Sequence, residues 1–117
     1  MSQQTVIDLE ELLDNLGRDE HLADQLLGRM AQDLPARLEA LRDAFAQEDP
    51  QAVHQISHPI KGALASVRAL EARDRAQRLD DAARSGDLEA ARAELPGVEA
   101  AAERLLAHIH ERLRREA

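Results

Sequence analysis

Residues 19–45, with the sequence DEHLADQLLGRMAQDLPARLEALRDAF, decide the fold class. Apolar residues recur there at spacings of three and four, which predicts one long helix with a buried stripe. The stripe consists of Leu22, Leu26, Leu27, Met30, Leu34, Leu38, Leu41 and Phe45. Asp19 is a suitable N-cap for this helix. Pro35 interrupts the hydrogen-bond ladder, but the stripe continues in phase beyond it, so we expect a bend and not an end.

The same spacing recurs on both sides of this segment. A short helix is expected to begin within residues 5–8 and to stop at Asn15-Leu16-Gly17. A third helix is expected to begin at Asp49-Pro50 and a fourth to end at Ser85-Gly86-Asp87, where a fifth begins, with a bend at Pro96-Gly97. The apolar positions of the third helix are Val53, Ile56, Ile60, Leu64 and Val67. Those of the fourth are Leu70, Ala72, Ala76, Leu79 and Ala83, and those of the fifth are Leu88, Ala91, Leu95, Val98, Ala102, Leu105, Ile109 and Leu113.

Short connections between long amphipathic helices make successive helices antiparallel neighbours. The predicted fold is therefore all-α, an up-down-up-down antiparallel four-helix bundle with an additional short N-terminal helix. Residues 1–117 show no linker, repeat or low-complexity stretch, which predicts a single domain. Because the chain begins with Met and fills one bundle, we expect a free-standing monomer and not a fragment of a larger kinase.

The composition supports helices and excludes several classes of protein. Hydrophobic residues make up 44% of the chain and aromatic residues 1%, so Leu, Ala, Ile and Val must form the core. There is no cysteine, hence no disulfide or thiolate site. No apolar run is long enough to cross a membrane and no secretory signal is visible, which predicts a cytoplasmic protein. The net charge of −8 argues against binding nucleic acid.

One of five histidines stands out by its position on the third helix. On a helical wheel His58 lies roughly 170° from the centre of the apolar stripe, and it should therefore face solvent. Lys61 and Gly62 follow at i+3 and i+4 and share its surface. An exposed imidazole is a nucleophile near neutral pH, a nearby ammonium would neutralise phosphoryl oxygens, and glycine leaves room for another protein's active site. This arrangement predicts phosphoryl transfer.

The run His58-Pro59-Ile60-Lys61-Gly62-Ala63 resembles the H-x-[LI]-K-G-[SA] signature of histidine-containing phosphotransfer (HPt) domains, which are phosphorelay intermediates of two-component signalling. The resemblance extends from about Ile7 to Ile109. Other stretches similar to these domains are Asp8-Leu9-Glu10-Glu11-Leu12, Leu34-Pro35, Ala69-Leu70, Leu79-Asp80 and Arg84-Ser85-Gly86-Asp87.

The resemblance implies a role for each residue. His58 would accept a phosphoryl group from a receiver-domain aspartate and pass it to another receiver, with Lys61 assisting and Gly62 giving docking room. Asp80 corresponds to an acid or amide that orients the imidazole in such domains; accepting Nδ1–H, it would leave Nε2 as the nucleophile. The neighbours on the docking surface would be His54, Gln55 and Ala65.

The resemblance also implies the partners. These would be response-regulator receiver domains, with a hybrid sensor kinase as a further candidate. The chain would be a phosphocarrier and not an enzyme that uses ATP, and it would need no cofactor of its own, because the receiver would hold magnesium.

Two departures from the family pattern leave alternatives open. Pro59 follows the nucleophile within a helix, where it costs about 3 kcal/mol unless the helix bends outward, and such a bend would either expose His58 further or misplace it relative to Lys61. Arg68 stands where the family often has glycine, so its backbone must avoid a left-handed conformation or tolerate strain. A degenerate bundle that binds receivers or kinases without being phosphorylated is one alternative, and an unrelated structural helical domain is another. A metal site at the i, i+4 pair His54 and His58 is disfavoured, because the chain has no Glu-x-x-His or Asp-x-x-His pattern.

Overall fold

The computed structural model describes residues 5–116, which form five helices and no strand. They are α1 (Leu9–Asn15), α2 (Glu20–Ala46), α3 (Pro50–Ser66), α4 (Leu70–Arg84) and α5 (Leu88–Glu116). The predicted all-helical class is confirmed. None of the helices within residues 5–116 is long and apolar enough to cross a membrane.

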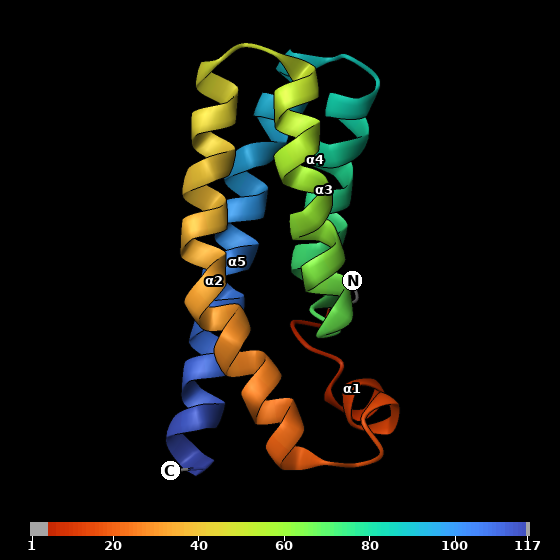
Figure 1. The fold of residues 1–117 in the computed structure, drawn as a ribbon, viewed down its shortest axis with the longest axis vertical. Helices are drawn as coiled ribbons and strands as arrows, with labels where there is room; N and C mark the ends of the chain where they lie inside the picture. Colours follow the sequence, from red (N-terminus) through yellow and green to blue (C-terminus); the bar gives the residue numbers. More distant parts are fainter. Residues whose placement is uncertain (1–4, 117) are drawn as a thin grey trace.

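The four long helices pack around one shared core. Helix α2 contacts α3, α3 contacts α4, α4 contacts α5, and α5 contacts α2, so the ring of helices is closed. Each connection within this ring is three residues long. In Figure 1 the chain rises along α2, descends along α3, rises along α4 and descends along α5, and α1 lies beside the lower end of α2.

Acidic caps fix where α1, α2, α3 and α5 begin, as the sequence predicts for the last three. The Asp87 carboxylate caps α5 by accepting a hydrogen bond from the Ala90 amide at 3.0 Å. The Asp19 carboxylate accepts a hydrogen bond from the Leu22 amide, and the Asp49 carboxylate accepts one from Gln51, each at 3.0 Å. Asp8 caps α1 in the same way, accepting from Glu11 at 3.1 Å. Each cap satisfies an amide that has no partner within its own helix.

Within the segment where a helix is expected to begin, Asp8 is the N-cap of α1, whereas Thr5, Val6 and Ile7 precede the helix. They run beside the connection between α3 and α4 instead. The Thr5 carbonyl accepts a hydrogen bond from the Glu71 amide at 3.1 Å, and the Asp8 amide donates to the Arg68 carbonyl at 2.9 Å. Helix α4 has no side-chain cap of its own, so the Thr5 carbonyl supplies a partner for its first turn.

The core is built from aliphatic side chains and Phe45, as the composition predicts. Alanines take many buried positions on α4 and α5, which lets these two helices approach closely. Those alanines are Ala72, Ala76, Ala83, Ala91, Ala101 and Ala102. Leu22 was predicted to be buried, but it is 37% exposed because it lies in the first turn of α2, at the end of the molecule.

Three prolines lie inside helices without ending them. Pro35 in α2, Pro59 in α3 and Pro96 in α5 are all exposed. Long helices bend with their convex side towards solvent, and there the ring of a proline clashes least with the preceding turn. The axis of α2 changes direction between its lower and upper parts in Figure 1. The bend predicted for α2 is therefore present, and α3 is continuous through Pro59.

We expect Pro59→Ala to raise the free energy of unfolding by about 1–3 kcal/mol, because alanine restores an amide donor to the Gln55 carbonyl and removes the steric conflict. Urea-induced unfolding followed by circular dichroism measures the change. Pro50→Ala is the matched control: Pro50 is the first residue of α3, where its missing amide costs nothing, so this variant should gain no stability. Equal effects of the two substitutions would contradict the prediction.

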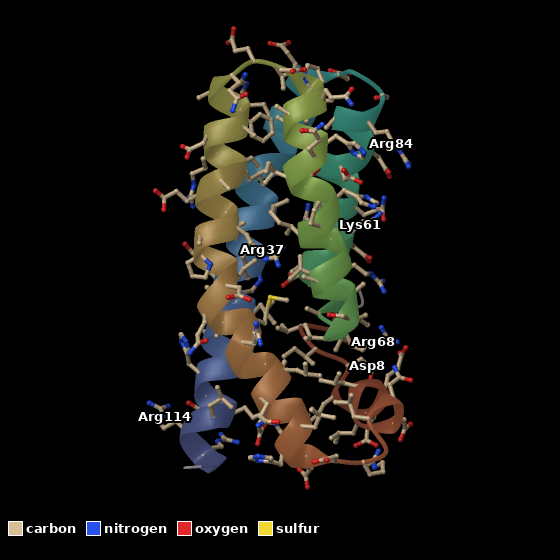
Figure 2. All side chains as sticks on the ribbon, in the orientation of Figure 1. Asp8, Arg37, Lys61, Arg68, Arg84 and Arg114 are labelled. Carbon is tan, nitrogen blue, oxygen red and sulfur yellow. The ribbon has the colours of Figure 1, made fainter. Side chains whose placement is uncertain are left out.

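Arg68 adopts the left-handed conformation, with φ of 58°, so the structure tolerates the strain. The residue is fixed on several sides. Its carbonyl accepts the Asp8 amide, its guanidinium Nη1 donates to the Ala65 carbonyl at 2.7 Å, and Nε forms an ion pair with Glu11 at 2.9 Å. Figure 2 shows Asp8 and Arg68 together where α1 meets the bundle. These contacts offset a backbone cost of about 1–2 kcal/mol.

Candidate functional site

A carboxylate lies buried between α3 and α4, in a core that is otherwise apolar. Asp80 is 0% exposed and Ser57 is 1% exposed, and these two are the buried polar residues of the described chain. Asp80 lies next to Leu79 on the inner side of α4, and Ser57 lies in phase with Val53 and Ile60 on α3. A buried charge is costly unless polar partners surround it.

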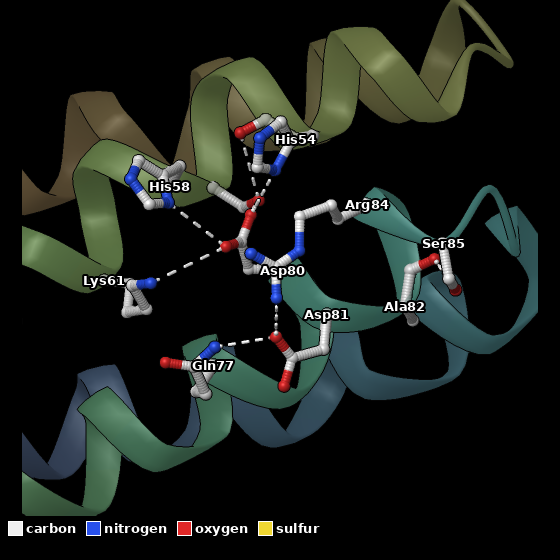
Figure 3. A network of polar contacts seen from close by, with 10 residues as sticks. His54, His58, Lys61, Gln77, Asp80, Asp81, Ala82, Arg84 and Ser85 are labelled. Atoms are coloured by element: carbon white, nitrogen blue, oxygen red, sulfur yellow. Dashed lines mark hydrogen bonds and ion pairs between the residues drawn. The ribbon is translucent and has the colours of Figure 1, made fainter.

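Four side chains of α3 provide those partners (Figure 3). Oδ1 of Asp80 accepts hydrogen bonds from the Ser57 hydroxyl at 2.7 Å and from Nδ1 of His54 at 2.8 Å. Oδ2 accepts one from Nδ1 of His58 at 3.3 Å and lies 3.8 Å from Nζ of Lys61. One carboxylate therefore organises two imidazoles, a hydroxyl and an ammonium from a neighbouring helix.

These contacts determine which nitrogen of each imidazole is free. A carboxylate only accepts hydrogen bonds, so Nδ1 of His54 and Nδ1 of His58 must each carry a proton. In the neutral ring the other nitrogen, Nε2, then has a lone pair and lies on the edge that faces away from Asp80. The tautomer that a nucleophilic histidine needs is thus favoured by the structure.

Asp80 itself remains ionised. Burial raises the pKa of its carboxyl. Hydrogen bonds from Ser57, His54 and His58, together with the nearby charge of His54, lower the pKa by more than burial raises it. The pKa of Asp80 therefore lies below its ordinary value. A carboxylate in this position stabilises positive charge on an adjacent imidazole.

The outer part of the site is open to a partner. The His58 side chain is 56% exposed, in agreement with its place on the helical wheel, whereas that of Lys61 is 21% exposed. Gly62 is exposed, and a β-carbon built on it would have no neighbouring atom within 4 Å. Gln55 is exposed and Ala65 is half-buried on the same helix. The packing of the bundle therefore does not require glycine at position 62.

The structure brings Asp80 to His58, the contact that the sequence predicts, and it also brings Lys61, Ser57 and His54 to the same carboxylate. Ser57 binds the carboxylate, and His54 binds it more closely than His58 does. The involvement of Ser57 could have been predicted from the sequence, because a residue with a hydroxyl group stands among the apolar positions of α3. Within residues 5–116, no three or more His, Cys, Asp or Glu side chains are grouped so that they could hold a metal ion.

Comparison with known proteins agrees with this description. The family model of the Hpt domain matches residues 25–115, which is most of the chain and includes the whole cluster around Asp80. The chain belongs to the Hpt domain family. No curated protein and no solved structure matches the chain. Hpt domains are phosphocarrier modules of phosphorelays that interact with receiver domains, and they are not catalytic enzymes.

Proposed function

We propose that His58 accepts a phosphoryl group from the aspartate of a receiver domain and passes it to the aspartate of another. The observation that carries this proposal is an exposed imidazole whose Nδ1 lies 3.3 Å from a fully buried carboxylate, beside an ammonium. Exposure lets a partner reach the ring, and the buried acceptor selects the tautomer with a free Nε2.

The chemistry follows from these contacts. Nε2 of His58 attacks the phosphorus of the receiver's acyl phosphate, the P–O bond to the receiver breaks, and the aspartate leaves as a carboxylate. Nδ1 keeps its proton, so the phosphorylated ring is cationic and is stabilised by the Asp80 carboxylate. The reverse steps, towards a second receiver, return the phosphoryl group to an oxygen. Phosphoryl transfer needs positioning and charge neutralisation more than covalent assistance.

Lys61 supplies the neutralising charge. Its ammonium lies 3.8 Å from Oδ2 of Asp80, the oxygen that also binds His58. A flexible four-carbon chain lets the ammonium move to phosphoryl oxygens on the adjacent ring without leaving the site. The chain itself would hold no cofactor, and magnesium would be held by the acidic pocket of the receiver.

A transfer assay tests the proposal. Receiver domains phosphorylated by a small phosphodonor are mixed with the chain, and acid-labile phosphate is mapped by mass spectrometry at neutral pH. We expect phosphate on His58. Receiver binding without transfer would instead favour the degenerate bundle that regulates receivers or kinases; the continuity of α3 through Pro59 and the tolerated conformation of Arg68 do not favour that alternative.

Gly62 provides a separate test of docking. We expect Gly62→Ala to raise the free energy of unfolding by about 0.5–1 kcal/mol, because glycine weakens a helix interior and nothing packs on this position. Gly62→Gln should fold equally well but transfer from a receiver about tenfold or more slowly, because a long side chain fills the space beside His58. Labelling by a small donor should not change. A receiver transfer rate equal to that of Gly62→Ala would contradict the docking role.

A further inference from the structure

The carboxylate of Asp80 orients two imidazoles, and the proposed function uses only one of them. His54 lies one turn before His58 on α3, and the two ring centroids are 5.5 Å apart. The bond from Nδ1 of His54 to Oδ1 is 2.8 Å long, against 3.3 Å for the bond from His58 to Oδ2. The geometric feature that prepares His58 for attack is therefore also present at His54, with a shorter bond.

We propose that His54 is a second phosphoryl acceptor of this protein, phosphorylated on Nε2 by small phosphodonors such as phosphoramidate. The inference deepens the proposed function, since it concerns the same carboxylate and the same face of α3. The His54 side chain is 28% exposed, which leaves its ring accessible to a small molecule. Its Nδ1 is directed at Asp80, so the opposite edge of the ring carries the free lone pair (Figure 3).

His54 and His58 differ in what surrounds the incoming phosphoryl group. Lys61 is at i+3 from His58 and binds the same oxygen of Asp80, whereas it is at i+7 from His54 and lies about two turns away. His54 is also half as exposed as His58. We therefore expect His54 to react on the order of ten to a hundred times more slowly, the effect of losing one charge-assisted contact in the transition state.

The two sites exclude each other. A phosphoryl group carries two negative charges near neutral pH, and rings 5.5 Å apart would bring two such groups together over a single buried carboxylate. Only one phosphoryl group should therefore be present on the pair at a time. Occupation of His54 would also place negative charge in the path of a receiver's phosphoaspartate and thereby block transfer to His58.

The chemical step balances without any further reactant. Nε2 of His54 attacks the phosphorus of phosphoramidate, a bond forms between Nε2 and phosphorus, and the bond from phosphorus to the donor nitrogen breaks. Near neutral pH that nitrogen is already protonated as –NH3+, so it takes the bonding electron pair and leaves as neutral ammonia. Nδ1 of His54 keeps its proton in the hydrogen bond to Asp80, so the carboxylate faces a cationic phosphorylated ring.

The test is phosphoramidate labelling of the full chain, followed by site mapping under non-acidic conditions. The variants are His58→Gln, His54→Gln and the double variant, in which His21, His108 and His110 remain as internal controls. We expect wild type and His54→Gln to be labelled on His58. His58→Gln should be labelled on His54, about ten to a hundred times more slowly than wild type and well above the double variant. Adding Asp80→Asn to His58→Gln should lower this labelling at least severalfold, because the amide lacks the negative charge that stabilises the cationic phosphorylated ring, even where its oxygen still accepts the Nδ1 proton of His54.

Labelling of His58→Gln no faster than the double variant, or spread equally over the three control histidines, would overturn the inference. The proposed function would stand in that case, because receiver transfer to His58 is measured separately in wild type. Conversely, labelling of His54 by phosphoramidate together with no receiver transfer to wild type would support the second acceptor and contradict the relay function. Circular dichroism melts of each variant establish that the bundle is intact.

Discussion

His58→Gln is expected to lower the rate of phosphoryl transfer from a phosphorylated receiver at least about a thousandfold, because it removes the attacking nitrogen. His54 cannot take over in this reaction. Its ring centroid lies 5.5 Å from that of His58, and a displacement of about 1 Å already costs roughly a hundredfold when donor and acceptor are held by docked proteins. Rapid-quench measurement of phosphate transferred from receiver to chain gives the rate.

The same variant should remain folded, which makes the kinetic result interpretable. The His58 side chain is 56% exposed, and glutamine can donate its amide N–H to Asp80, so we expect the free energy of unfolding to change by no more than about 0.5 kcal/mol. His110→Gln, an exposed histidine on α5, is the control for a substitution away from the site. Transfer to His58→Gln at the wild-type rate would show that another residue carries the phosphoryl group.

The contrast between the two donors separates docking from reactivity. A receiver presents its phosphoryl group in one orientation, so only a nucleophile at the matching position reacts. A small donor has no such constraint and reports the intrinsic reactivity of each imidazole. For His58→Gln we therefore expect a large loss of phosphorylation rate with the receiver and a smaller loss with phosphoramidate. One carboxylate that orients two histidines accounts for this difference.

The helices could be predicted from the sequence because short-range patterns fix them. Apolar spacing defines each amphipathic face, and Asp19 and Asp49 satisfy amides only three and two residues away. The same patterns did not show that Thr5, Val6 and Ile7 lie outside α1. Residues 5–8 bind the backbone of Arg68 and Glu71, and no local pattern reports a partner that far along the chain.

The exposure of His58 followed from the helical wheel, but the burial of Asp80 did not. The resemblance to HPt domains assigned Asp80 a place beside the imidazole and implied nothing about its burial, yet it is 0% exposed. Its burial depends on how closely α3 approaches α4, which the small side chains Ala76 and Ala83 on the inner face of α4 permit. The contacts to His54 and Ser57 cross 26 and 23 residues of sequence. Contacts between residues so far apart in the sequence are set by the packing of two helices and not by spacing along one helix.

Asp80→Asn tests this packed cluster, and we expect it to slow receiver transfer about ten- to a hundredfold. An amide has one accepting oxygen where the carboxylate has two, and its nitrogen donates. The imidazole that faces the amide nitrogen must then release its Nδ1 proton and carry it on Nε2, which removes the nucleophilic lone pair. If the oxygen stays with Ser57 and His54, which lie closest, His58 faces the nitrogen. The measurement is again rapid-quench transfer.

The substitution should also destabilise the bundle in a pH-dependent way. We expect a loss of about 1–3 kcal/mol at pH 7, because a buried carboxylate with several donors is replaced by a group that pairs with fewer of them. The pKa of Asp80 is lower in the folded chain than in the unfolded chain, where it is about 3.9. Its contribution is therefore complete above that value and is lost as pH falls through the folded pKa, so the two proteins should converge in strong acid.

Asp81→Asn is the matched control, since it removes the same charge from the next residue of α4. Asp81 is exposed and binds Gln77 and Arg84 at the surface, so its loss should change the free energy of unfolding by no more than about 0.5 kcal/mol and leave transfer unaffected. Urea unfolding of both variants at neutral and acidic pH makes the comparison. Equal behaviour of the two variants would mean that net charge, and not the carboxylate beneath the histidines, controls this face of the bundle.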